Sequence, residues 1–170
     1  MAKWIWEISD HHIGIHAYLG IVFRQSCGNG HLAVAKWLWE ISTQIIDIHI
    51  HEKYSFRLSC ENGHLDIVKF LASLPIVDPT ADNNYVIRGA SYAGHIGVVK
   101  FLASLPNVDP SANNYQAIKW ASLKGHLDIV KFLVNLPDNN PAANNNEVIH
   151  FAIRSGHSSV VEFLSTLLNV

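Results

Sequence analysis

Charged residues are scarce in this chain and make up only 15% of its 170 residues. The formal net charge is −2, so the chain as a whole lacks the basic footprint of a nucleic-acid-binding protein. No apolar run approaches the roughly 18 to 20 residues of a membrane span, and the N-terminus lacks a signal-peptide pattern. We therefore expect a cytoplasmic protein that makes no membrane contact.

Sequence motifs of catalysis are also missing. The chain has no Gly-x-Ser-x-Gly elbow, no Gly-rich phosphate loop and no His-Glu-x-x-His. Its acidic residues are scattered and not paired. We therefore expect no enzyme activity, no cofactor and no metal.

What the chain does contain is a repeated dipeptide. Gly-His occurs at Gly30, Gly63, Gly94, Gly125 and Gly156, with spacings of 33, 31, 31 and 31 residues. The surrounding decapeptides are alike: NGHLAVAKWL, NGHLDIVKFL, AGHIGVVKFL, KGHLDIVKFL and SGHSSVVEFL. A fixed period of this length is typical of a solenoid, in which each unit covers the apolar face of its neighbour.

Each unit is predicted to contain two helices. The apolar residues after each Gly-His have helical spacing, and a second helical segment with a small residue in register (Ser59, Ala90, Ala121, Ala152) precedes it. The glycine is expected to end the first helix in the left-handed conformation. Asn83, Asn114 and Asn145 are expected in left-handed turns before the first helices, and the isoleucines of 13–16 and 46–49 favour extended hairpin limbs.

These features resemble the ankyrin repeat, strongly at Gly-His-Leu and in the apolar core of the second helix. The family's Thr-Pro-Leu-His is replaced, for example by Tyr85-Val86-Ile87-Arg88. The Leu-Pro-x-Val-Asp-Pro-x-Ala variant is similar to arrays of large DNA viruses and amoebal protists, which would place the chain in the cytoplasm of a host cell. The resemblance implies an all-α helix-turn-helix solenoid, one array over 1–170 with short hairpin turns. Its expected units are a half repeat at 1–9 and five repeats at 13–42, 46–75, 77–106, 108–137 and 139–168.

The histidines and cysteines are assigned structural roles. Adjacent Gly-His histidines should lie roughly 10 Å apart, too far to share one zinc ion, so each is expected to bond backbone at its helix start or adjacent turn. Cys27 and Cys60 occupy equivalent core positions, too far apart for a disulfide. Trp4, Trp6, Trp37 and Trp39 are expected to fill the core between repeats, with the convex surface as the alternative for Trp6 and Trp39.

One row of cations departs from a core pattern. Equivalent places in four successive first helices hold basic residues: Arg24, Arg57, Arg88 and Lys119. Either each pairs with a group of the neighbouring unit, or together they form an exposed basic ridge for an acidic or phosphorylated partner.

The resemblance implies protein–protein interaction through hairpin tips and the concave helix surface, by a monomer. Carried over by register, the partner-binding residues are Tyr18, His51, Lys53, Glu61, Asp82, Asn84, Tyr92, Asn113, Tyr115, Leu123, Lys124, Asn144, Asn146 and Arg154. The alternative function is a metal- or nucleic-acid-binding module that uses hairpin histidines (His11, His12, His16, His49, His51) or the basic ridge. A spacer within a longer scaffold is a third interpretation.

Overall fold

The computed structural model describes residues 12–45, 52–137 and 143–168, with side chains described over 18–41, 53–137 and 146–167. In this part of the chain the regular structure is entirely helical, and the helices form five successive pairs. The pairs are α2 (His12–Gly28) with α3 (Leu32–Ile45), α4 (Glu52–Glu61) with α5 (Leu65–Ala72), α6 (Ala81–Ala93) with α7 (Ile96–Ala103), α8 (Ala112–Lys124) with α9 (Leu127–Val134), and α10 (Ala143–Arg154) with α11 (Ser158–Leu168). The predicted half repeat at 1–9 lies outside the described residues.

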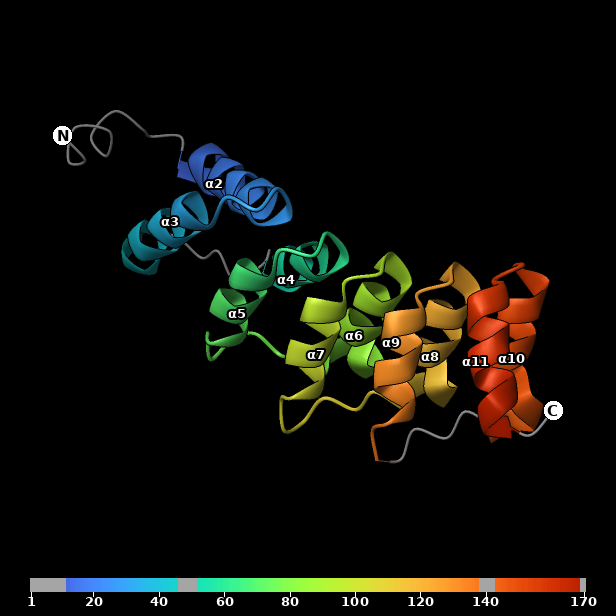
Figure 1. The fold of residues 1–170 in the computed structure, drawn as a ribbon. Helices are drawn as coiled ribbons and strands as arrows, with labels where there is room; N and C mark the ends of the chain where they lie inside the picture. Colours follow the sequence, from blue (N-terminus) through green and yellow to red (C-terminus); the bar gives the residue numbers. More distant parts are fainter. Residues whose placement is uncertain (1–11, 46–51, 138–142, 169–170) are drawn as a thin grey trace.

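The pairs stack in chain order, so that the first helix of each unit packs on the first helices of its neighbours (Figure 1). The second helices form a parallel row beside them, and the pairs α2/α3 and α10/α11 lie at opposite ends of the stack. Because the main contacts between the described helices lie within one unit or between units that are adjacent in the chain, the array is a solenoid, as the repeat spacing predicts.

The core lies between the two rows and between successive units. Small residues recur where the first helices meet, and the four predicted ones, Ser59, Ala90, Ala121 and Ala152, are all fully buried. The free thiols of Cys27 and Cys60 are buried one position further along, where the next two units have serine. Trp39 packs against Phe23, with 6.2 Å between ring centroids. Trp37 is 58% exposed, so its predicted place in the core is wrong.

The Gly-His glycine ends the first helix of each pair, as predicted. All five glycines have φ between +74° and +88°, a conformation that costs a residue with a Cβ roughly 1–2 kcal/mol. The next helix starts directly after the histidine, whose side chain does not cap its own helix at His64, His95 or His126.

The histidine ring instead reaches back to the preceding unit. His95 Nε2 lies 2.8 Å from the carbonyl oxygen of Glu61, two residues before the preceding glycine. Three other rings make the same contact: His64 with Gly28, His126 with Tyr92 and His157 with Leu123, at 2.9–3.0 Å. The prediction of a backbone hydrogen bond is therefore confirmed, but its acceptor belongs to the neighbouring repeat. The histidine joins two units.

The turns between units differ from the prediction at one end of the array. Asn83 and Asn114 are left-handed, as predicted, and lie within runs of three such residues at 82–84 and 113–115. Residues 13–16 lie inside helix α2, so the extended limb predicted there is wrong. The corresponding limb at 46–49 lies outside the described residues. Among the described helices, none combines the length and apolarity needed to cross a bilayer.

Candidate pocket at the junction of two repeats

The row of cations is built into the contacts between units. Arg57 donates to Tyr85 Oη at 2.6 Å, Arg88 donates to Gln116, and Lys119 pairs with Glu147. Each partner lies 28 residues further along, at one register position of the next unit. Arg88 and Lys119 are only 7% exposed, so these two cations do not form an exposed ridge, and the pairing alternative is found for Arg57, Arg88 and Lys119. Arg24 holds the same position in α2 and is partly buried.

The junction between α6 and α8 is closed at the hairpin side. Asn84, the last left-handed residue before α6 continues, is 8% exposed, and its Oδ1 accepts a hydrogen bond from the Asp109 N–H at 3.0 Å. Val108 beside it is likewise 8% exposed. The predicted place of Asn84 on the exposed partner surface is therefore wrong, because its amide oxygen satisfies a backbone donor of the next unit.

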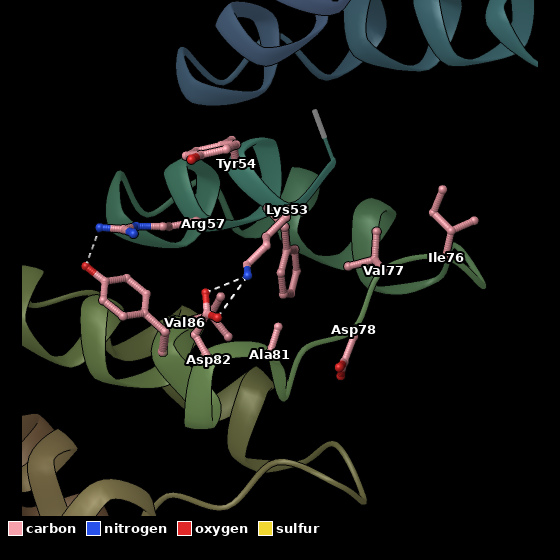
Figure 2. A pocket seen from close by; sticks show the side chains of 11 residues that line it. Lys53, Tyr54, Arg57, Ile76, Val77, Asp78, Ala81, Asp82 and Val86 are labelled. Atoms are coloured by element: carbon pink, nitrogen blue, oxygen red, sulfur yellow. Dashed lines mark hydrogen bonds and ion pairs between the residues drawn. The ribbon is translucent and has the colours of Figure 1, made fainter. Parts of the chain in front are cut away.

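The equivalent junction between α4 and α6 is open. Lys53 holds the position in its unit that Asn84 holds in the next, since each lies equally far before the Gly-His glycine of its own unit. The Lys53 ammonium contacts the Asp82 carboxylate at 2.8–2.9 Å. A pocket of about 340 Å³ remains between α4, the turn after α5 and the start of α6 (Figure 2). Its lining residues are Lys53, Tyr54, Phe56, Arg57, Ile76, Val77, Asp78, Ala81, Asp82, Tyr85 and Val86. We call this the α4/α6 pocket.

The walls of the α4/α6 pocket are mainly apolar and aromatic. Phe56 and Val86 are buried in its floor, whereas Val77 is partly exposed although its equivalent Val108 is covered. Tyr54, at 57% exposure, forms an edge. The pocket therefore exposes part of an interface that the next junction hides.

The charged groups around the pocket balance each other. Lys53 and Asp82 form an ion pair across it, with side chains 61% and 55% exposed (Figure 2). Arg57 stacks on the Tyr85 ring at 3.9 Å and donates to Glu61 at 3.0 Å, so its position is fixed by two partners. Hydrogen bonds from the Thr80 hydroxyl and N–H hold the pKa of the Asp78 carboxyl below its usual range. Two cations and two carboxylates leave the lining without net charge.

A second hollow, of about 460 Å³, lies between the turns that follow α5 and α7. It is lined by Ala72, Asp78, Pro79, Thr80, Leu105, Pro106, Asn107 and Val108. This lining has neither a cation nor an aromatic side chain, the two groups that most often anchor a partner. We therefore take the α4/α6 pocket as the candidate site.

The structure brings Lys53 and Asp82, two of the predicted partner-binding residues, together at the pocket. The others are spread along the array. Exposed are Tyr18, Tyr92, Asn113, Lys124 and Arg154; partly buried are Glu61, Tyr115, Leu123 and Asn146. His51 and the side chain of Asn144 lie outside the described part. The same holds for the side chains of the hairpin histidines His11, His12, His16 and His49.

A second exposed cluster contains three aromatic and basic side chains. Lys124 lies over the Tyr92 ring at 4.4 Å, and Tyr92 meets Trp120 edge-on at 5.6 Å. Tyr92 and Lys124 were predicted from register, whereas Trp120 was not. The pocket residues Tyr54, Ile76, Val77 and Tyr85 were also missed. The sequence signal that could have revealed the pocket is Lys53, which stands where the next repeat has Asn84.

Neither of the two cysteines lies in a setting that activates a thiol. Burial raises the pKa of the Cys27 thiol to about 12 and also raises that of Cys60, which opposes a reactive thiolate. Within the described ranges, no three His, Cys, Asp or Glu side chains cluster in a way that could hold a metal ion.

Comparison with known proteins agrees with the helical pairs. Residues 87–169 match the family model of ankyrin repeats, in three copies. No curated protein matches the chain. Ankyrin repeats are generally protein–protein interaction modules, and the family is typically not enzymatic. Residues 87–169 therefore consist of ankyrin repeats, and the helix pairs α2/α3 and α4/α5 that precede them have the same Gly-His joints.

Proposed function

We propose that the chain is a non-catalytic protein-interaction module whose partner inserts an apolar side chain into the α4/α6 pocket. The observation that carries the proposal is the difference between two equivalent junctions. Val108 and Asn84 are covered at the α6/α8 junction, whereas Val77 and Lys53 are not covered at the α4/α6 junction. A side chain of the partner would cover the apolar wall that is exposed because Lys53 stands in the place of an asparagine.

The size and lining of the pocket favour such an anchor. Its 340 Å³ lies near the lower end of the range for ligand sites, which suits one side chain better than a large cofactor. Binding energy in protein interfaces concentrates on a few side chains that fill dry pockets. Burial of one Leu- or Phe-sized side chain contributes about 1.5–3 kcal/mol.

The rest of the interface is proposed to follow the hairpin tips and the concave helix surface. Lys53 and Asp82 flank the pocket and are exposed, so they can exchange their ion pair for contacts to a partner. Tyr92 and Lys124 lie further along and supply an aromatic face with a fixed cation beside it. In this proposal the chain acts as a monomer in the cytoplasm.

Selection from a displayed peptide library tests the proposal without knowledge of the natural partner. Peptides selected on the full chain are measured against Ile76→Asp, which places a carboxylate in the pocket wall. The matched control is Asn107→Asp, the equivalent position at the closed junction. We expect Ile76→Asp to weaken binding at least about 10-fold and Asn107→Asp to leave it unchanged, since a tenfold change corresponds to about 1.4 kcal/mol. If Ile76→Asp binds the peptides as tightly as Asn107→Asp does, the interface does not include the α4/α6 pocket and the proposal is wrong.

A further inference from the structure

We propose that the partner places a carboxamide, from an asparagine or glutamine, beside the apolar side chain that fills the α4/α6 pocket, and that the carboxamide oxygen accepts a hydrogen bond from the Asp78 N–H. The inference rests on the proposed function and specifies a second group of the partner, next to the apolar side chain in the pocket. It follows from what Asn84 does one unit further along.

The two junctions present the same turn to that group. Asp78 Oδ1 accepts the Thr80 N–H at 2.8 Å, and Asp109 Oδ1 accepts the Ser111 N–H at 2.8 Å. The N–H of Val77 donates to the Leu74 carbonyl at 3.1 Å, and that of Val108 donates to the Leu105 carbonyl at 3.2 Å. The N–H of Ala81 donates to the Asp78 carbonyl at 3.3 Å, as that of Ala112 does to the Asp109 carbonyl at 3.2 Å. The Asp78 N–H therefore has the same local setting as the Asp109 N–H.

The two donors differ in what faces them. The Asp109 N–H donates to Asn84 Oδ1, whereas Lys53, in the equivalent place, has no acceptor atom. Among the described residues, none accepts a hydrogen bond from the Asp78 N–H. Since Asp78 lines the pocket, a bound group can reach its backbone there.

The surrounding charges favour a neutral acceptor. The Asp78 carboxyl next to the N–H stays ionised down to lower pH than usual and repels a second carboxylate. Lys53 is held by Asp82 on both carboxylate oxygens, which reduces its attraction for another anion. A carboxamide offers an oxygen to the N–H and NH2 donors to the nearby carboxylates, so it satisfies both kinds of group.

The test is NMR spectroscopy of the full chain with selective ¹⁵N-aspartate labelling, because the amide signals of Asp78 and Asp109 are then observed in the same spectrum. The probe is N-acetyl-L-asparagine N-methylamide, and the N-methylamides of N-acetyl-L-leucine and N-acetyl-L-aspartate serve as controls, because they carry the same backbone groups but no primary carboxamide. We expect the asparagine probe to move the Asp78 amide proton downfield, toward the Asp109 position, and to leave Asp109 unchanged. The variant Asn84→Gly, which keeps the left-handed turn, should make Asp109 respond as well.

Two results would overturn the inference: an unmoved Asp78 amide, or equal shifts with the leucine or aspartate probe. The peptide selection separates this failure from failure of the proposed function. Peptides that depend on Ile76 but have no preferred Asn or Gln would refute the carboxamide and leave the interaction site standing. Recovery of no Ile76-dependent peptide would refute the site itself.

Discussion

Four of the five Gly-His glycines are required for two separate reasons, whereas Gly156 is required for only one, so substitution by alanine can separate the two effects. At Gly125 (φ +77°) an added Cβ would lie 2.5 Å from Nδ1 of His157, whose Nε2 bonds to the Leu123 carbonyl at 3.0 Å. At Gly156 (φ +74°) nothing lies within 4 Å of an added Cβ. Gly156→Ala therefore changes the backbone conformation alone, and Gly125→Ala also displaces the ring that joins two units.

The expected magnitudes follow from these contacts. The left-handed conformation costs alanine roughly 1–2 kcal/mol at either site. Loss of the histidine hydrogen bond adds about 0.5–1.5 kcal/mol at Gly125. Urea unfolding monitored by circular dichroism should therefore show Gly125→Ala to be less stable than Gly156→Ala by about 1 kcal/mol, with similar slopes.

The variant His157→Ala provides the control. In that background the ring is gone, and Gly125→Ala should cost only as much as Gly156→Ala does. Equal costs of the two glycine substitutions in the unmodified chain would refute the reasoning. A cost at Gly125 that persists unchanged without the His157 ring would refute it as well.

Three further predictions concern buried polar groups and the exposed cluster. Glu147→Ala should destabilise the chain by about 1–2 kcal/mol because it leaves the buried Lys119 ammonium unpaired, whereas Lys119→Met should cost less, as urea unfolding can show. Because folding raises the pKa of Cys27 to about 12 and that of Cys60 too, the unfolded thiols ionise first, near pH 8.5. Stability should therefore fall as the pH rises from 8 to 10, and the double substitution Cys27→Ala, Cys60→Ala should remove that part of the decline. Tyr92→Ala should weaken binding of selected peptides that span the concave surface, and Lys124→Met should do so less, as calorimetry can measure.

Much of the fold could be predicted from the sequence because Gly and Asn mark conformations that other residues avoid. Gly125 and Asn114 are left-handed where the pattern predicts it, and the helices begin and end around them. Small residues such as Ala121 are buried where first helices meet. These are local consequences of backbone sterics and residue size, which repeat spacing makes visible.

The contacts between units could not be read in the same way. Register shows that His95 and Arg88 recur, but it does not show that each side chain crosses to a neighbouring unit. Register with the ankyrin repeat predicts Asn84 on the partner-binding surface, yet the next unit covers it. The α4/α6 pocket arises from one residue, Lys53, that breaks a pairing which only the three-dimensional stack defines.

The most direct test of the account fills the α4/α6 pocket from within. Ala81→Phe adds an apolar ring to its wall and leaves the Lys53–Asp82 ion pair in place. The measurement is the affinity of a selected peptide for this variant by calorimetry, with urea unfolding as the check on the fold. The account predicts at least about a 10-fold loss of affinity with the stability retained, whereas undiminished binding to a filled pocket would contradict it.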